Sequence, residues 1–488
     1  MANGTVVGDL SNTVQAEITP GIRESMGPTD GIFERIRNSS MGVKRDGIGR
    51  DFYVYHNFIA SLAGAYYWRA NPLGSTTLTS VLPGHVLNSV NAFPGAGEAA
   101  NMGTVQRRLQ LVQGTGNFFL PVQLFQVDQL DAATIKYVGL NIQQVAKLVA
   151  HMRAVSFWHV APAGTLQPLG QIETVTDGGG TSDDTVTVTV DGSTYGIGRI
   201  RNFYPGMFVD ILDAGSGYAS LKDSRDYAVV TEVDPFNKTV KIALTTSTYD
   251  WEAQIVAGDV IVAKDCAAAT DGYGPSGVED WVKAVDTGTD VQVFNIYIST
   301  DGSDLLYPQF GSLVAAVSAP LTEAVLNKYV GGFMDATGKK LDTLATTGGV
   351  VREMLEQVDD LGVFQRQGAA LDLVNGWSKI GYQYGGQSLQ WLISSFISPG
   401  RLYGLKTGEG NLTRYVPPKI PGTGSHASFD GDVQFIAKMS GSTNIFKPLH
   451  NSSGNTTEVM EAPFITLEEI APMDVQSVKL TGITESNP

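Results

Sequence analysis

The sequence predicts an α+β fold in which one long helix is followed by an inserted all-β module. Three observations support this prediction. Across 131–157, apolar residues recur at alternating steps of three and four, which is the spacing of one helix face. Directly after this segment the pattern changes to period two and keeps that period for about a hundred residues. From 320 onwards, helical and strand-like patterns alternate over short distances.

The composition narrows the class of protein. A chain of 488 residues is long enough for roughly two to four domains with a sizeable core. Only 17% of the residues are charged, and 56 glycines are spread along the chain, which indicates many turns and extended segments. The formal net charge of −16 argues against tight binding of nucleic acid through its phosphates. Cys266 is the single cysteine, which excludes an internal disulfide and a thiolate metal cluster.

The first 128 residues lack the periodic apolar positions of a self-sufficient core. Repeated Gly and Pro residues break 1–50 into an extended arm, which we expect to be ordered by lying on a neighbour. The following segment, 51–128, carries aromatic strand-like runs separated by turn residues, and it predicts a long irregular hairpin or loop excursion. The N-terminus lacks the basic and apolar regions of a signal peptide, and no run of about 18 apolar residues predicts a membrane span.

The predicted helix at 131–157 spans roughly 40 Å at 1.5 Å per residue. Its other faces carry Lys, Gln, His and Arg, which make it too polar to cross a membrane. A rod of this length with a β module at its end is typical of a building block rather than of a small-molecule enzyme. The predicted apolar stripe consists of Ile135, Val138, Ile142, Val145, Val149 and Met152.

The segment 166–268 has the pattern of an independent β module. Strand-like runs follow one another at short spacing, and Asp191-Gly192 and 235–238 supply turns between them. Five or six such strands make a small closed barrel or a sandwich. The predicted strands are 185–190, 207–212, 227–233, 239–244 and 259–263.

The rest of the chain predicts a mixed lobe. A helix is expected over 322–336, with Thr322 as its N-cap and Gly338 as its C-terminal stop. A strand at 341–345 precedes a second helix at 349–358. Further short strands are predicted at 371–374, 381–384, 389–396, 403–405, 433–437 and 475–480.

Motifs of catalysis or cofactor binding are poorly represented. There is no nucleophile elbow and no His-Glu-x-x-His motif. The segment 332–339 lacks the spacing of a phosphate loop and is better explained as the end of a helix. His151 and His159 lack a third ligand, so core or surface histidines are favoured over a metal site. We therefore expect no enzymatic activity, no cofactor and no metal.

The order of these pieces resembles the major capsid proteins of tailed bacteriophages, which have the Hong Kong 97-type fold. The segment 281–289 is similar to the one that re-enters the core of such proteins after an insertion. The segments 320–326 and 341–352 resemble the first helix, the strand and the second helix of their axial lobe. The later part of the family pattern is matched by 394–403 and 462–464.

The resemblance implies a division of the chain. Some family members begin with a charged coiled-coil scaffolding segment that is cut off, and nothing here matches it. The implied parts are an N-terminal arm (1–50), an extended loop (51–128), a peripheral lobe with a spine helix (129–165), an inserted β-barrel domain (166–268), further peripheral lobe or extended segment (269–319), an axial lobe (320–430) and a C-terminal return to the peripheral lobe (431–488).

The resemblance also implies a function. The chain would assemble with itself into the hexamers and pentamers of an icosahedral shell around a double-stranded DNA genome, in the virion and, before that, in the bacterial cytoplasm. A portal protein is an implied partner, decoration or cement and scaffolding proteins are left open, DNA contact is weak and non-specific, and no membrane is involved. The candidate inter-subunit contacts are Tyr53, Tyr55, Tyr66, Tyr67, Trp68, Phe93, Phe118 and Phe119.

Some members of this family join neighbouring subunits covalently through a lysine on the extended loop. No lysine occurs between Lys44 and Lys136, and guanidinium groups cannot replace the amine because they stay protonated. We therefore expect a shell held by non-covalent contacts.

An all-β surface or adhesion protein is the alternative function. It would bind carbohydrate through 166–268, with Tyr218 and Trp251 as exposed aromatic residues. This alternative does not account for the long helix or for the mixed lobe.

Overall fold

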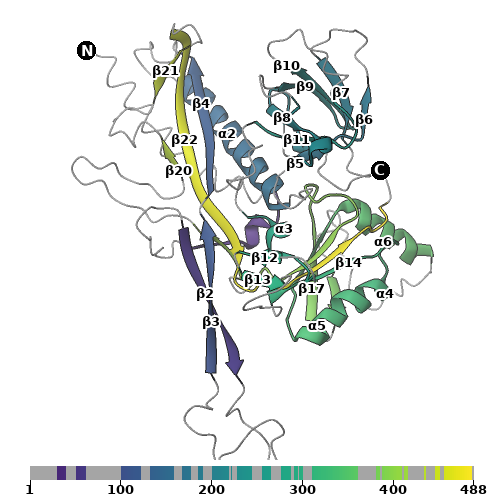
Figure 1. The fold of residues 1–488 in the computed structure, drawn as a ribbon. Helices are drawn as coiled ribbons and strands as arrows, with labels where there is room; N and C mark the ends of the chain where they lie inside the picture. The colour runs from purple at the N-terminus through teal and green to yellow at the C-terminus, as the bar shows by residue number, and fades with distance from the viewer. Residues whose placement is uncertain are drawn as a thin grey trace, which may run out of the picture. The chain divides into compact units, whose positions relative to one another are not determined.

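The computed structural model (Figure 1) forms two compact units. The first consists of Met1–Val43, Leu111–Val293 and Tyr297–Pro488, and the second of Lys44–Gln110 with Phe294–Ile296. The structure describes residues 30–39, 51–61, 101–110, 112–121, 132–158, 168–176, 185–190, 200–218, 221–222, 228–244, 255–264, 276–286, 291–294, 296–299, 310–360, 381–384, 387–408, 411–415, 433–435, 446–450 and 456–485.

The second unit is built on a long two-stranded ladder. Strands β2 (Asp51–Ser61) and β3 (Asn101–Gln110) run antiparallel, with one irregularity near the end of β2. Aromatic and β-branched residues at the start of β2 favour this extended conformation. A hairpin of β2 and β3 thus lies within the predicted segment 51–128, and among the described strands these two pair only with each other. The predicted limit at 128 is wrong, because 112–121 forms a strand of the first unit that pairs with 459–468.

The long helix α2 (Ala132–Trp158) agrees with its prediction to within one residue at each end. The buried face of its middle turns differs from the predicted stripe. Ala146, Ala150 and Ala154 are fully buried, whereas Val145 and Val149 are only partly buried. The helix packs on β4 (Val112–Pro121).

Strand β22 (Thr456–Pro472) is the centre of the sheet beside α2 (Figure 1). It has 17 residues, whereas an ordinary strand has about five or six. Strand β4 pairs along one edge of β22. The other pairing partners of β22 are β21 (Lys447–His450), β20 (Val433–Phe435) and β19 (Leu412–Tyr415), and β1 (Arg37–Ser39) pairs with β19 in parallel.

The described part of the N-terminal arm lies on its own chain. A single 3₁₀ turn, η1 (Phe33–Arg35), precedes β1. Ile32 is fully buried, and the Arg35 guanidinium donates hydrogen bonds to the side chains of Thr343 and Gln390. Ile32 and Phe33 are buried within the same chain, and the expectation that the arm lies on a neighbour stays a prediction.

The β module forms a seven-stranded sheet in the order β5-β11-β8-β9-β10-β7-β6. Strands β5 and β6, at the two ends of this order, are separated in sequence by only Ile172 and Glu173. Alternating burial along β7 matches the predicted period of two. The strands are β5 (Pro168–Gln171), β6 (Thr174–Thr176), β7 (Thr185–Thr189), β8 (Phe208–Leu212), β9 (Ala228–Asp234), β10 (Thr239–Leu244) and β11 (Val260–Ala263), with 3₁₀ turns η5 (Ile200–Asn202) and η6 (Ala214–Ser216) between them.

A second six-stranded sheet has the order β14-β23-β18-β15-β17-β16. Its strands are β14 (Leu313–Ala316), β15 (Thr343–Thr346), β16 (Gly381–Tyr384), β17 (Gln387–Ile393), β18 (Leu402–Leu405) and β23 (Val478–Thr481). The associated helices are α4 (Glu323–Leu326), the π-helical turn η8 (Asn327–Gly331), α5 (Gly332–Thr337) and α6 (Gly348–Asp360). A short helix, α3 (Val278–Trp281), and the pair β12 (Val291–Val293) and β13 (Ile296–Ser299) precede it.

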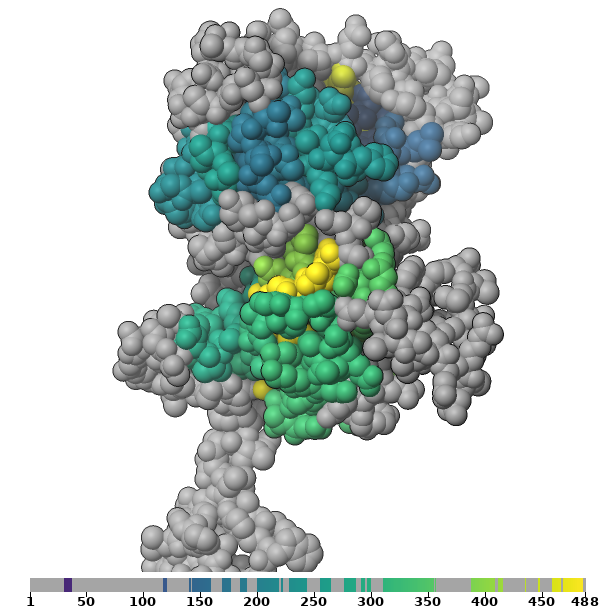
Figure 2. Space-filling view, turned by 90° about the vertical axis from the view of Figure 1, so that its right-hand side faces the viewer, coloured from purple at the N-terminus to yellow at the C-terminus, as the bar shows by residue number. Residues whose placement is uncertain are grey.

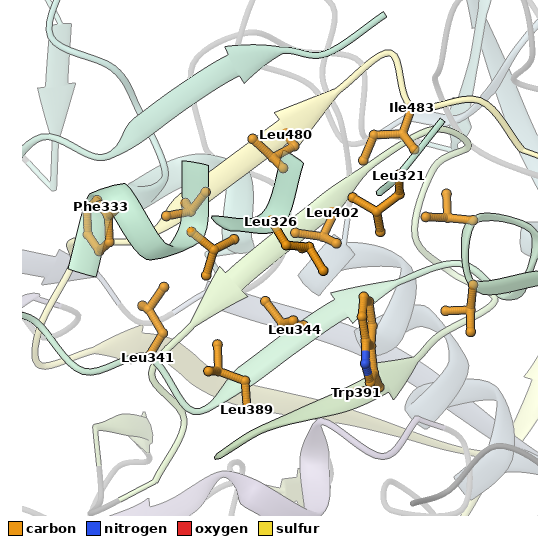
Figure 3. Close-up of a cluster of buried hydrophobic side chains, with 14 of the residues drawn as sticks. Leu321, Leu326, Phe333, Leu341, Leu344, Leu389, Trp391, Leu402, Leu480 and Ile483 are labelled. Carbon is orange, nitrogen blue, oxygen red and sulfur yellow. The ribbon is translucent and has the colours of Figure 1, made fainter. Parts of the chain in front are cut away.

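The predicted limits of the helix after Pro320 are confirmed. The Thr322 hydroxyl accepts a hydrogen bond from the Val325 amide, and Gly338 ends α5 with φ +67°. Beneath the helices lies an apolar cluster that we call the axial core (Figure 3). Figure 2 shows the helical residues in green with the C-terminal residues in yellow beside them. The axial core is centred on Leu321, Leu326, Val330, Phe333, Leu341, Leu344, Leu389, Trp391, Leu402, Val478, Leu480 and Ile483.

None of the helices in the described part of the chain combines the length and the apolar character needed to cross a membrane.

Candidate functional site: a buried polar junction at the end of the long helix

The last two turns of α2 carry an unusual set of buried polar side chains. His151, Arg153 and Trp158 are each less than 5% exposed. Because they project from one rigid helix end, each can bind a segment that is distant in sequence. We call these three residues and their partners the junction.

The first contact of the junction ties down the N-terminal arm. The Asp30 carboxylate accepts hydrogen bonds from the Trp158 indole (2.6 Å), the Ser394 hydroxyl (2.5 Å) and the Ile32 amide (3.1 Å). Burial raises the pKa of the Asp30 carboxyl, and these three hydrogen bonds offset that effect only in part. Phe33 adds an edge-on contact with Phe157, at 6.0 Å between ring centroids. One carboxylate therefore joins the arm, the helix and the end of β17.

The second contact joins α2 to the β module. His151 Nε2 lies 3.4 Å from the carbonyl oxygen of Asn202, and Nδ1 lies 3.1 Å from the Tyr204 hydroxyl. The ring also contacts those of Tyr204 and Phe396, at centroid distances of 4.5 and 5.0 Å. Burial lowers the pKa of His151 to about 4, with a smaller effect in the same direction from Arg201, so the imidazole is neutral at pH 7. A neutral ring fits these partners, donating from Nε2 and accepting at Nδ1.

The third contact is an ion cluster. The Glu468 carboxylate of β22 binds the Nε atoms of Arg153 and Arg414, the latter at 2.5 Å. All three side chains are at least 95% buried. Burial alone would raise the pKa of the Glu468 carboxyl, but attraction to the two guanidinium groups outweighs it and lowers the pKa. Buried clusters of this kind add geometric specificity, and they are costly to break because a desolvated charge is left behind.

A second ion cluster lies next to the junction. Glu279 of α3 binds the Lys479 ammonium, the Arg401 guanidinium at 3.4 Å and the Tyr403 hydroxyl at 2.5 Å. Burial would raise the pKa of the Glu279 carboxyl, but the charges of Lys479 and Arg401 lower it overall. The Tyr403 ring lies 5.7 Å from that of Trp158, so this cluster adjoins the junction at Trp158.

These contacts join segments of the first unit that are distant in sequence. No group of three or more His, Cys, Asp or Glu side chains in the described residues could hold a metal ion. Asp30, His151 and Glu468 are buried, and each is hydrogen-bonded or ion-paired within the chain. The arrangement fixes four segments of the first unit at one helix end: the arm, the β module, the β22 sheet and the sheet that contains β18 and β23.

The structure separates the residues that were predicted to contact other subunits. Phe118 is fully buried against Phe446, whereas its neighbour Phe119 is 50% exposed, as strand alternation requires. Tyr53 and Tyr55 lie on β2. Tyr66, Tyr67, Trp68 and Phe93 lie outside the described residues, as do His159 and Trp251. The role of all eight aromatic residues in assembly stays a prediction.

The sequence prediction missed the junction almost entirely. His151 is the buried core histidine that was favoured over a metal ligand. Two features could have indicated the ion cluster: Arg153 stands among apolar residues at the end of a helix, and Glu468 interrupts an apolar strand. An isolated charge in such a run indicates a buried partner, although it does not identify that partner.

No protein-family profile and no curated protein matches this chain. Among solved structures, the chain is similar to the holo-SrpI encapsulin complex from Synechococcus elongatus PCC 7942, at 12% identity and a TM-score of 0.21 over 36% of this chain and 56% of the other. This chain thus spans little more than half the length of the encapsulin.

Phage structures match over most of the chain. The capsid of cyanophage A-1(L) is similar at 10% identity and a TM-score of 0.37, over 94% of this chain and 92% of that one. A structure from Mycobacterium phage Adephagia is similar at 10% identity and a TM-score of 0.36, over 94% and 91% of the two chains. These TM-scores lie below 0.5, so the similarities carry no argument about fold or function. Both are argued from the contacts within this chain.

Proposed function

We propose that this chain is a structural shell subunit, the major capsid protein of a tailed bacteriophage with a Hong Kong 97-type fold. It would assemble with itself into the hexamers and pentamers of an icosahedral shell around double-stranded DNA. The observation that carries this proposal is the β2–β3 hairpin, which forms a compact unit of its own.

A lone two-stranded ladder is at best marginally stable in water. The β2–β3 ladder has ten paired positions, from Asp51↔Gln110 to Ser61↔Asn101, and no third strand among the described residues extends it. A hairpin of this length gains stability when it lies on another surface. A neighbouring copy of the chain supplies such a surface in a shell, and repetition of this contact closes the assembly.

The junction supports the same proposal. A shell subunit must present several contact surfaces in fixed relative positions, because small errors accumulate around a closed assembly. The buried clusters around Glu468 and Glu279 hold segments of the first unit together by directional bonds rather than by apolar packing alone. An enzyme would instead need an accessible set of reactive groups. We propose a non-enzymatic role.

Finer parts of the proposal follow the same reasoning. We propose that 166–268 is an inserted, barrel-like domain, because the ends of its strand order meet at Ile172 and Glu173. The net charge of −16 favours weak and non-specific contact with packaged DNA. A portal protein and, optionally, decoration and scaffolding proteins would be further partners, with assembly in the bacterial cytoplasm.

The carbohydrate-binding alternative has no specific support. The Tyr218 hydroxyl is bound to Gln171, and its ring packs on the apolar cluster of Leu212, Val260 and Val262.

Electron microscopy of the purified full-length chain tests the proposal. We expect rings of five or six subunits, or closed shells, at micromolar concentration. A matched variant replaces residues 62–100, between β2 and β3, with a short Asn-Gly turn, which preserves the ladder but shortens the hairpin. This variant should keep the circular dichroism spectrum of the first unit and lose the ability to form rings. Monodisperse single chains from the unaltered protein would refute the proposal.

A further inference from the structure

One face of α2 remains apolar and accessible. Val145, Leu148, Val149 and Met152 follow the spacing i, i+3, i+4, i+7 and therefore form one surface over two turns. Leu148 is 48% exposed, and the other three are partly buried, whereas Ala146 and Ala150 on the adjacent face are fully buried. We call these four residues the α2 apolar patch.

The helix that carries the patch is basic within an acidic protein. None of its 27 residues is Asp or Glu, and Lys147, next to Leu148, is exposed. The whole chain has a net charge of −16. An acidic segment with regularly spaced apolar residues would complement this surface in both charge and polarity.

The N-terminal segment starts from the end of the same helix. The described chain begins at Asp30, whose carboxylate is bound to the Trp158 indole. From Trp158 back to Val145 is about 20 Å along the helix at 1.5 Å per residue. Residues 1–29 can reach on the order of 95 Å when extended, so the whole patch lies within their range.

The sequence of 1–29 has the required chemistry. It contains three acidic residues and one basic residue, Arg23. From position 10 onwards its larger apolar side chains recur at every fourth position, so in an extended segment they all project to the same side. These residues are Leu10, Val14, Ile18, Ile22 and Met26.

We infer that residues 1–29 of the same chain bind the α2 apolar patch, running back along the helix from the Asp30 anchor. The bound segment covers Leu148 and Met152, and its acidic residues lie near a helix without acidic side chains. This contact goes beyond the proposed function, since it holds within one chain whether or not chains assemble.

Limited digestion of the full-length chain with trypsin tests the inference. Arg23 is the first basic residue, so cleavage there releases the peptide 1–23, which mass spectrometry quantifies over time. In Leu148→Asp the peptide should be released about tenfold faster or more, because a buried leucine contact is replaced by a desolvated charge. Leu140→Asp is the matched control, since Leu140 is equally exposed but lies outside the patch, and its release rate should equal that of the unaltered chain.

A second pair of variants acts from the other side of the contact. Ile18→Asp should accelerate release to the same degree as Leu148→Asp without any change to the helix, and Thr19→Asp should have no such effect. Equal rates in the unaltered chain, Leu148→Asp and Ile18→Asp would overturn the inference. A release rate that rises on serial dilution would also overturn it, because protection would then come from the arm of a second copy.

Discussion

The axial core and the junction lie in the same unit but are stabilised in opposite ways. The axial core is held by aliphatic and aromatic side chains such as Leu344, Leu402 and Leu480, which are fully buried beneath α4 and α5 (Figure 3). The junction buries Arg153, Glu468 and other polar groups at the end of α2. Apolar burial is non-directional and tolerates repacking, whereas ion clusters require fixed distances.

This difference separates two tasks within one chain. An apolar core stabilises a lobe but sets the positions of its surfaces only loosely. The Glu468 cluster joins the helix α2 to the strands β19 and β22, and it does so through three groups at defined separations. The axial core thus supplies stability, and the junction supplies relative position. The predictions below test this distinction.

The largest effect is expected for Glu468→Gln. The substitution leaves the guanidinium groups of Arg153 and Arg414 without their buried counter-charge, which should lower the free energy of unfolding by about 3–5 kcal/mol. Urea denaturation measures this loss. Glu461→Gln is the matched control, because Glu461 lies on the same strand but pairs with the exposed Lys447, a contact worth about 0–1 kcal/mol. Equal losses of unfolding free energy in the two variants would show that the buried ion cluster contributes no more than a surface ion pair.

Leu344→Ala tests the other side of the comparison. Leu344 is fully buried in the axial core, so its truncation should cost about 3 kcal/mol through lost burial and a residual cavity. Differential scanning calorimetry should show a lower midpoint for this variant. The paired variant Leu344→Ile keeps the volume and should lose less than about 1.5 kcal/mol. If Leu344→Ile lowered the free energy of unfolding as much as Leu344→Ala, the axial core would depend on side-chain shape as strictly as the junction depends on distance.

The same comparison explains what could be predicted from the sequence. Strands β7 to β11 and the helix α2 were located to within about one residue, because burial on one face imposes a period of two or 3.6 that is visible locally. Thr322 and Gly338 were identified as helix limits because capping is also a local interaction. An element whose own residues carry a periodic or capping pattern can therefore be located from the sequence.

Strand β22, by contrast, was missed although it is the longest strand described. Pro463 and the consecutive glutamates Glu468 and Glu469 interrupt the alternation of polar and apolar residues along this strand. The two carboxylates are bound by partners from other parts of the chain. The alanine face of α2 was also missed. Alanine contributes little to a hydrophobicity pattern, which instead highlights Val145 and Val149, although these are less buried than Ala146, Ala150 and Ala154. Tertiary partners at large sequence separation cannot be identified from one sequence without an alignment.

A pH titration of stability sharpens the comparison further. The folded-state pKa of His151 is lowered to about 4, so the folded protein disfavours the charged imidazole. Its contribution is complete above the unfolded pKa of about 6.5 and is lost as the pH falls towards 4. Between pH 7.5 and 4.5 this residue should cost the protein about 2.5 kcal/mol. Glu468 and Glu279, with lowered pKa values, act in the same direction only below about pH 4.5.

The variant His151→Gln isolates this effect. It retains a donor and an acceptor but does not titrate, so the stability loss between pH 7.5 and 4.5 should shrink by about 2.5 kcal/mol. The raised pKa of Asp30 opposes this loss of stability at low pH, because protonation of its carboxyl favours the folded state. The contribution of Asp30 is the same in both proteins, so it cancels in the comparison. Parallel pH profiles for the two proteins would show that His151 is not protonated on unfolding in this range.

The smallest effect is expected at the N-terminus of α4, where a single local hydrogen bond can be removed. The Thr322 hydroxyl accepts from the Val325 amide at 3.3 Å, one of the amides that the helix itself leaves without a partner. Thr322→Ala should lower the free energy of unfolding by about 1 kcal/mol, and Thr322→Ser should restore most of it because serine caps equally well. Both are measured by urea denaturation. The effect of this substitution should be independent of the junction. In a double-mutant cycle, the interaction energy between Glu468 and Arg153 should be the same with Thr322 or with Ala at that position, because the effects of distant sites add independently. A coupling energy well above about 0.5 kcal/mol would show that stability and position are not supplied by separate regions of this chain.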